Sequence, residues 1–449
     1  MNNRDIEWRS KKLKAHREAI ESGQLNALRE MLPNEAIEQV CKESGYYFRT
    51  RLLSPLGVVF HMIAAGISRE GSFQSAWHLA GQVGRSGSLA KGRKRLPLEI
   101  WHGIDKWMIK EIDGEFGEDR WRGHRMMGTD GTCISMSDEP DLEKYFGRCG
   151  SRDRQSRFPV GRMTLVFNLK SLILEGHRLG PYHRDETELL KPMLDQELRA
   201  GDVLVGDRHF AGANLYAEYQ AAGVGFITRA HQCLRVEDLK IVHEWNPEDR
   251  LVEMKIAARY RNINSQWPEK IIVRIIQMSA KLEGRRETSW VVTSLLNAEV
   301  YPAHEICGWL KKRWKVEGLI EELKIWLGAD VLRSKSVEGV FKEVYARIIG
   351  LNLFHWLILK AARKHQQEPE RLSVSAALRL AAAQSLKMST APAWQLLSLF
   401  EELLQNIARS RIPYRPDRIE PRMIKRDRNK FPILKITRPE WRNLHTMAA

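Results

Sequence analysis

Apolar residues recur at helical spacing through the first quarter of the chain. Residues 37–41, 52–67 and 73–79 carry this spacing, which predicts a helical N-terminal domain over residues 1–120. From about residue 121 the pattern changes to short apolar runs that alternate with helical segments. This alternation favours an α/β fold, in which a sheet is layered by helices.

The α/β part can be divided into elements. A first strand follows His124, and the runs 163–169 and 172–177 are typical of a hairpin. Val203–Val205 is wholly apolar, as expected of a buried parallel strand. The remaining elements are helices predicted over 187–198 and 213–222 and a strand predicted over 224–228.

Residues 230–295 interrupt this order. Alternation over residues 251–256 and the β-rich run 271–276 indicate a mostly β insertion. Helical spacing then returns in a helix that is predicted to begin near Pro302 and to end near Gly328.

A second long helix is predicted over residues 337–364. The α/β domain is therefore expected to extend over residues 121–365. Residues 366–449 are expected to form a C-terminal region of helices and a basic tail.

The charge of the chain points to a polyanionic partner. Its 449 residues include 72 Lys and Arg against 56 Asp and Glu, a net charge of +16, and each phosphate that a basic residue neutralises releases a counterion. A membrane surface is the competing polyanion, but no apolar run reaches the roughly 20 residues that span a bilayer. The longest run, residues 348–359, is broken by Asn352 and His355.

The N-terminus and the cysteines indicate the compartment. The first residues carry no signal-peptide core. Five cysteines are scattered with neither zinc-ligand nor redox spacing, so reduced thiols in a cytoplasm are expected.

Two basic segments are candidate DNA contacts. Around Arg93, Lys94 and Arg95, a short helix, a glycine-containing turn and a basic stretch are typical of a helix-turn-helix, or alternatively of a solvated basic loop. Residues 409–442 hold twelve basic residues and four acids, a net charge of +8, and several prolines. This tail is either an extended arm that follows phosphates or a solvated disordered segment.

Three acids stand where a catalytic site would need them. Asp130 lies within or just after the first strand, and Asp207 directly follows Val203–Val205. Groups at the carboxyl ends of strands face the working crevice of an open α/β sheet. Glu317 lies on the later helix, at its expected half-buried edge. Two strand-end acids and one helix carboxylate could form an oxygen-rich Mg²⁺ site.

Each acid also has a plainer interpretation. A lone Asp-Gly is more often a turn former, and Arg313 with Glu317 has the spacing of a common surface ion pair. On a continuous helix, Arg313, Glu317 and Lys324 would fall within roughly a 40° arc. The order Asp, Asp and then Glu on a late helix is a sharper signal than any single member.

These blocks resemble DDE-type bacterial insertion-sequence transposases of the insertion-sequence-four family. The signature around the family's glutamate is Tyr, two residues, Arg, three residues, Glu, six residues, Lys. Arg313, Glu317 and Lys324 match it, whereas Leu310 stands at the tyrosine position. The resemblance implies a ribonuclease-H-like catalytic domain, with the β-rich insertion over about residues 230–295.

The resemblance also implies a mechanism. Asp130, Asp207 and Glu317 would ligate two Mg²⁺ ions, or Mn²⁺ in their place, for cut-and-paste transposition through a DNA hairpin and final strand transfer. Arg313 and Lys324 would contact DNA phosphates. Trp290 would stack on a flipped base, unless it is a core residue of its apolar strand.

The implied partners are the double-stranded terminal inverted repeats of the element and the target DNA. The protein would act as a homodimer on DNA, in the bacterial cytoplasm near the nucleoid and without a membrane. Two rivals stay open: a nuclease with the same site that joins no strands, and a DNA-binding regulator that derives from such an element and has lost catalysis.

Overall fold

The computed structural model describes most of the chain between Met31 and Pro413. The described residues are 31–413, apart from 49–52, 68–72, 80–85, 118–119, 152–153, 263, 265–266, 283–284, 327–328 and 330, together with residues 436, 440 and 443. They belong to two compact units. Unit 1 consists of 1–108, 134–160 and 323–449, and unit 2 of 109–133 and 161–322. Most of the predicted basic tail therefore lies outside the described residues.

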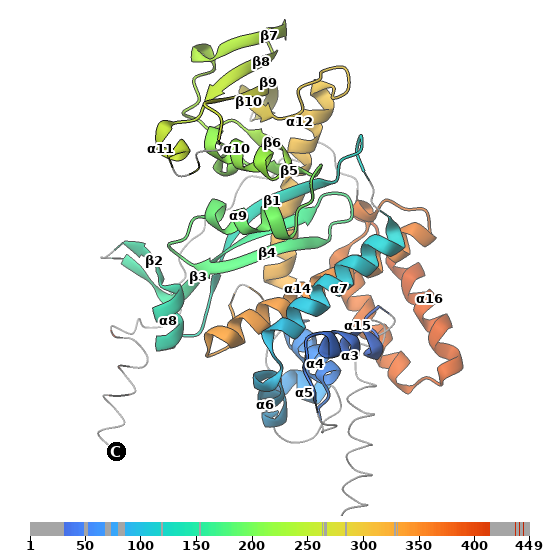
Figure 1. Ribbon diagram of the computed structural model, residues 1–449. Coiled ribbons are helices and arrows are strands. Elements are labelled where there is room, and N and C mark those ends of the chain that lie inside the picture. Colours follow the sequence, from blue (N-terminus) through green and yellow to red (C-terminus); the bar gives the residue numbers. More distant parts are fainter. Residues whose placement is uncertain are drawn as a thin grey trace, which may run out of the picture. The chain divides into compact units, whose positions relative to one another are not determined.

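A mixed sheet forms the centre of unit 2 (Figure 1). Its first five strands, in spatial order, are β4 (Leu174–Pro181), β3 (Arg154–Asn168), β1 (Met126–Ser135), β5 (Val203–Gly206) and β6 (Gly225–Arg229). β3 and β4 form the predicted antiparallel hairpin, whereas β1, β5 and β6 are parallel. The short run in β5 is wholly buried, as predicted for a central parallel strand.

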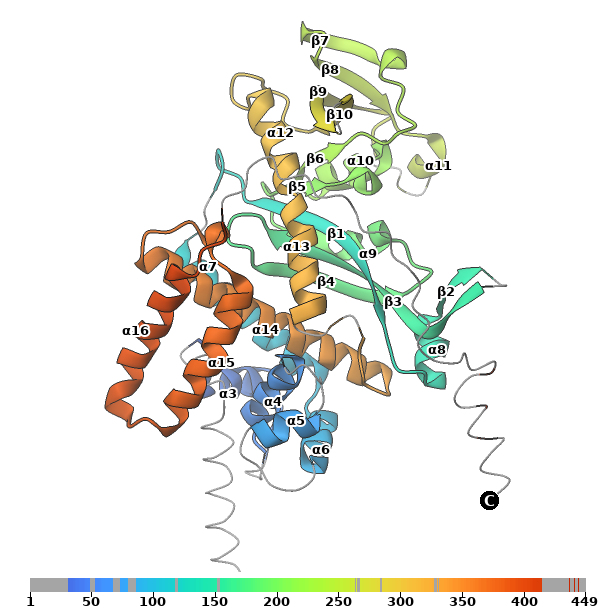
Figure 2. The ribbon, with the colours of Figure 1, turned by 180° about the vertical axis from the view of Figure 1, so that it is seen from behind.

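Helices cover both faces of this sheet. α9 (Glu186–Gln196) and α10 (Ala213–Ala221) lie on one face (Figure 1). Their apolar residues join the strands in one core, in which Tyr216 stacks on Phe226 with ring centroids 4.1 Å apart. α12 (Ala303–Lys312) and α13 (Trp314–Glu321) lie on the opposite face (Figure 2). The α/β layering expected from the alternating pattern is thus present.

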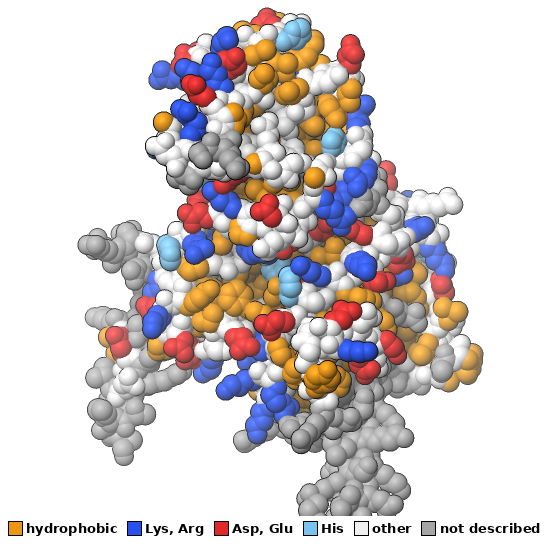
Figure 3. Space-filling model, viewed as in Figure 1, with side chains coloured by type: hydrophobic (Ala, Val, Ile, Leu, Met, Phe, Trp, Pro, Cys, Tyr) orange, Lys and Arg blue, Asp and Glu red, His pale blue; other side chains and the backbone are white. Residues whose placement is uncertain are grey.

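The mostly β insertion extends the same sheet. β10 (Arg285–Thr293) pairs antiparallel with β6, and β9 (Lys270–Leu282), β8 (Asp249–Lys255) and β7 (Lys240–Asn246) follow outward. The described part of the insertion also contains a 3₁₀ turn, η2 (Val236–Asp238), and a short helix, α11 (Ala258–Arg261). Every residue of β7 is exposed, and Figure 3 shows hydrophobic side chains over these outer strands, where Ile241, Val242 and Trp245 are exposed.

Unit 1 is mainly helical. Its helices are α3 (Asn34–Glu43), α4 (Pro55–Ile67), α5 (Phe73–Leu79), α6 (Gly87–Arg95), α8 (Pro140–Phe146), α14 (Val337–Lys364), α15 (Val374–Thr390) and α16 (Ala393–Arg409), with the first part of α7 (Leu98–Phe116) and the short strand β2 (Arg148–Ser151). α14 packs against α4, α15 and α16 and has the bounds that the sequence predicts.

Among the described helices, α14 alone has the length and apolarity to cross a membrane. Within its most apolar stretch, 89% of the residues are buried inside the protein. Asn352 and His355, the polar residues that interrupt the apolar run 348–359, are buried as well. These properties are those of a core helix.

The basic segment is helical, so the interpretation as a solvated loop is wrong. Residues 87–95 form one continuous helix, α6, and Gly92 lies inside it without a turn. Helix packing decides this, because a Cβ on Gly92 would come within 2.8 Å of a methyl group of Val58 on α4. Glycine lets the two helices approach closely, which outweighs its low helix propensity. The helix-turn-helix interpretation stays a prediction, because residues 80–85 between α5 and α6 lie outside the described residues.

Arg93 makes contacts within unit 1. Its guanidinium donates to the Ser334 hydroxyl at 2.8 Å and lies over the Phe73 ring, 4.6 Å from the centroid. Burial lowers the pKa of this guanidinium. Arg93 is thus half-buried and takes part in the internal packing of unit 1, whereas Lys94 and Arg95 are exposed. The predicted DNA contacts of all three residues stay predictions.

Candidate active site

Two parallel strands bring the first two acids to one edge of the sheet. Gly128 of β1 pairs with Val205 of β5, and Asp130 and Asp207 each lie two residues further along. Asp130 Oδ1 accepts from the backbone N–H of Gly131 at 2.8 Å. Asp207 Oδ1 accepts from the backbone N–H of His209, also at 2.8 Å, and caps a short 3₁₀ turn. Asp130 therefore lies within β1 and Asp207 directly after β5, and a nearby backbone N–H group fixes each carboxylate.

The third acid comes from α13. Val316 of this helix packs against Gly128, where an added Cβ would lie only 2.7 Å from the valine methyl group. The missing side chain lets the helix approach β1 two residues before Asp130. The Glu317 side chain is 59% exposed, so the expected half-buried position is wrong. Its neighbour Val316 faces the core instead.

Arg313 connects the strand acid to the helix acid. Its Nη1 donates to Asp130 Oδ2 at 2.9 Å, and its Nη2 donates to Glu317 Oε1 at 3.1 Å. The guanidinium is almost buried, with 9% of the side chain exposed. One cation therefore fixes two carboxylates that are 187 positions apart in numbering and brings them to one place.

Electrostatics show that the acids influence one another. Burial is the largest influence on Asp130 and raises the pKa of its carboxyl. The charges of Asp207 and Glu317 raise it as well, while the Gly131 N–H and Arg313 oppose the shift. The three predicted acids therefore converge on one region of unit 2.

A fourth carboxylate lies beside them. A Cβ on Gly131 would collide with the carboxyl group of Glu186, the first residue of α9. Burial raises the pKa of Glu186, and the charge of Asp130 raises it further. We did not single out Glu186 from the sequence. The signal was the acid-rich run Asp185–Glu188 at a helix start, a pattern equally typical of a cap.

Comparison with known proteins identifies the family. The model of the transposase DDE domain matches residues 121–353, a range that contains all four acids. The chain belongs to the DDE-type transposases of the IS4 family. Transposase InsG for insertion sequence element IS4, from Escherichia coli (strain K12), is 22% identical to this transposase over 322 residues, 70% of either chain.

Two further proteins are similar to this transposase over different lengths of the chain. Putative transposase InsZ from the same organism is 32% identical over 95 residues, 20% of this chain and 32% of that protein. A piggyBac transposase in a synaptic complex with hairpin DNA covers 86% of this chain and 85% of its own, with 9% identity and a TM-score of 0.44. No functional conclusion follows from a structural likeness at that level.

DDE transposases use divalent metal ions, so the acids must be compared with that requirement. Carboxylate oxygens are the ligands that Mg²⁺ prefers. The oxygen donors of these acids are therefore suited to a divalent ion. Within the described residues, however, no three His, Cys, Asp or Glu side chains stand close enough together to hold an ion. Arg313 instead bridges Asp130 and Glu317.

The helix that carries Glu317 differs from its prediction. The predicted helix begins where expected but is not regular: Arg313, which has helical backbone angles, separates α12 from α13, and a π-helical turn, η3 (Glu322–Trp326), follows. The predicted end of the helix at Gly328 lies outside the described residues. Lys324 lies in that turn and is half-buried. The arc predicted for it on a regular α-helix no longer applies, because a π-turn has a different rise and rotation. Such turns are frequent at functional sites.

Trp290 is half-buried in β10. It packs against the hydrophobic core that α10 shares with the sheet. Part of the ring therefore serves the core, which was the alternative to base stacking. The stacking role stays a prediction.

Proposed function

We propose that this transposase moves its element by cut-and-paste transposition, with Asp130, Asp207 and Glu317 as the catalytic carboxylates. The observation that carries the proposal is the bridge of Arg313 between Asp130 and Glu317. Isolated surface acids would not share a nearly buried cation, since burying charges is costly unless they are paired. Asp207 joins this pair through the parallel register of β1 and β5.

The chain's own groups orient the reacting DNA in this proposal. Asp130 and Asp207 are fixed by backbone N–H groups, while the exposed Glu317 can adjust to the substrate. Two Mg²⁺ ions held by these acids would activate the attacking oxygen and stabilise the leaving oxygen. Lys324, Lys94 and Arg95 would contact phosphates, as would the basic tail.

The proposal includes a ribonuclease-H-like catalytic fold. The order β4, β3, β1, β5, β6, with a hairpin on one side and parallel strands on the other, supports it. A homodimer would hold both terminal inverted repeats in the cytoplasm. Hairpin closure, with a flipped base on the exposed part of Trp290, completes the scheme.

The test uses amide variants. Asp130→Asn, Asp207→Asn and Glu317→Gln each remove one anionic ligand at little cost in shape. Cleavage of a linear duplex that carries the element's terminal repeat should fall by more than about 100-fold, beyond the 10- to 100-fold typical of losing an outer partner. Binding of the same duplex should be retained.

The matched control is Glu188→Gln, at an exposed position in the first turn of α9. It makes the same chemical change near the site and should cleave at the wild-type rate. Cleavage by Asp207→Asn at the wild-type rate would remove the site assignment. Cut ends that never join to target DNA would indicate a nuclease instead.

A further inference from the structure

Both oxygens of Asp130 are already engaged. Oδ1 accepts from the Gly131 N–H, and Oδ2 accepts from the Arg313 guanidinium. The same guanidinium holds Oε1 of Glu317. A cation that binds Asp130 Oδ2 and Glu317 Oε1 therefore competes with the Arg313 guanidinium for these oxygens.

The place of Arg313 favours such a replacement. The residue lies between α12 and α13 with helical backbone angles, so its side chain can change rotamer without unfolding either helix. Glu317 is largely exposed and is held to Arg313 by a single hydrogen bond. The contact that must open is thus at the edge of the site, while Asp130 stays in its strand.

The surrounding charges make the exchange consequential. The negative charges of Asp207 and Glu317 both raise the pKa of Asp130, and the charge of Asp130 raises the pKa of Glu186. Arg313 offsets part of this negative charge with its own charge. Since like charges repel, a guanidinium at this position lowers the affinity for a second cation, and its departure raises that affinity.

We propose that Arg313 is a built-in counter-cation of the DNA-free transposase, which competes with a divalent cation for the oxygens of Asp130 and Glu317. The proposal rests on the proposed function, which assigns these two acids. The consequence is that DNA binding and cation binding are coupled. The guanidinium can leave the two acids and bind phosphate oxygens of the DNA instead, to which arginine also binds in a bidentate fashion. DNA that takes Arg313 away would then promote cation binding, so that the complete site forms only on a substrate.

The test measures cation binding without DNA and without catalysis. Mn²⁺ is titrated into the full-length protein, and free Mn²⁺ is followed by its electron paramagnetic resonance signal. Arg313→Gln should bind the first Mn²⁺ at least tenfold more tightly than the wild type, a difference of about 1.4 kcal/mol. In the double variant Arg313→Gln with Asp130→Asn, the gain should disappear.

The matched control is Lys312→Gln. Lys312 is exposed on α12 and lies over the Trp309 ring, 4.6 Å from the centroid. Its replacement removes one positive charge from the adjacent position without touching the acids, and Mn²⁺ affinity should stay at the wild-type value. Equal Mn²⁺ affinity in Arg313→Gln and Lys312→Gln would overturn the proposal.

Arg313 is nearly buried, so its variants are also melted. Should Arg313→Gln fail to fold, Arg313→Lys carries the test, because an ammonium cannot span both acids as the planar guanidinium does. This variant should bind Mn²⁺ at least threefold more tightly than the wild type, and wild-type affinity would overturn the proposal. Failure of the cleavage test with Asp207→Asn is a separate result, since no Mn²⁺ titration depends on activity.

Discussion

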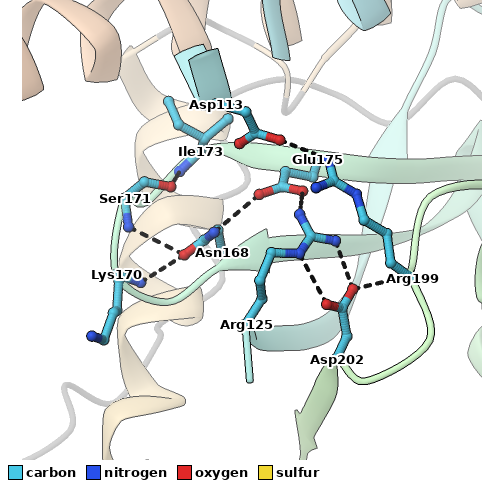
Figure 4. Close-up of polar contacts among 9 residues, drawn as sticks. All are labelled: Asp113, Arg125, Asn168, Lys170, Ser171, Ile173, Glu175, Arg199 and Asp202. Atoms are coloured by element: carbon cyan, nitrogen blue, oxygen red, sulfur yellow. Dashed lines mark hydrogen bonds and ion pairs between the residues drawn. The ribbon is translucent and has the colours of Figure 1, made fainter. Parts of the chain in front are cut away.

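A buried ion network at the other end of β1 and β5 is expected to dominate the stability of unit 2 (Figure 4). Arg125 stands directly before β1, and its Nε and Nη2 donate to Asp202 at 2.9 and 2.6 Å. Its Nη1 donates to Glu175 of β4 at 2.6 Å. All three residues are buried, so one guanidinium joins three strands or strand ends.

Arg125→Leu should destabilise the protein strongly. The change leaves Asp202 and Glu175 buried without their cation, and removing one partner of a buried pair costs about 3–5 kcal/mol. For a unit of this size, that loss lowers the melting temperature by roughly 6–20 °C. Scanning calorimetry of the full chain is the suitable measurement, because two units need not unfold in one transition.

The loss should also depend on pH. Burial raises the pKa of the Glu175 carboxyl, and Arg125 opposes this shift. Without Arg125 the folded-state pKa rises further above the unfolded value, so folding takes up a proton. The stabilising contribution of that proton is present at low pH and is lost as the pH rises through the folded-state pKa. The deficit of the variant should therefore be smaller at pH 5 than at pH 8.

Arg199→Leu is the matched control. Arg199 pairs with Asp113 at 2.6 Å near the same network, but 47% of its side chain is exposed. Such a surface pair contributes only about 0–1 kcal/mol. The reasoning is refuted if Arg125→Leu melts no lower than Arg199→Leu, or if its deficit is the same at both pH values.

Two further predictions concern the site. Gly131→Ala should reduce DNA cleavage by about 10- to 100-fold while terminal-repeat binding is retained, because the new Cβ displaces the Glu186 carboxyl group beside Asp130; wild-type cleavage would show that Glu186 is not part of the site. Trp290→Ala should still nick DNA but accumulate unclosed ends on a denaturing gel, since stacking offsets about 1–3 kcal/mol per base. Early melting with parallel loss of nicks and hairpins would mark Trp290 as a core residue only.

The sequence by itself determined features that depend on neighbouring residues. The bounds of α14 follow from its apolar spacing and from Ser336, whose hydroxyl accepts from the Gly339 N–H as a helix cap. The wholly apolar run of β5 predicted a buried parallel strand, which the pairing with β1 and β6 confirms. Signals of this kind act within one or two turns of chain, so local pattern is sufficient to find them.

Packing between distant segments decided the rest. Gly92 is a poor helix residue, but contact with Val58 keeps it inside α6, and Arg93 is then directed to Ser334, 241 positions away. The insertion joins the central sheet because β10 pairs antiparallel with β6, along the edge of β6 that β5 leaves open. No local pattern encodes which edge or which neighbour a segment will meet.

The same distinction applies to the site. The order of Asp130, Asp207 and Glu317 could be predicted from the sequence because two apolar strands and a late helix have recognisable patterns. The sequence did not predict the hydrogen bond from Arg313 to Asp130, across 183 positions, nor the position of Glu186 beside the site. Both depend on glycines, Gly128 and Gly131, whose missing side chains let a helix and a carboxylate approach β1. The sequence therefore determined which groups the site contains, whereas only the tertiary structure decided which of them touch, because contact depends on the space that the folded chain leaves.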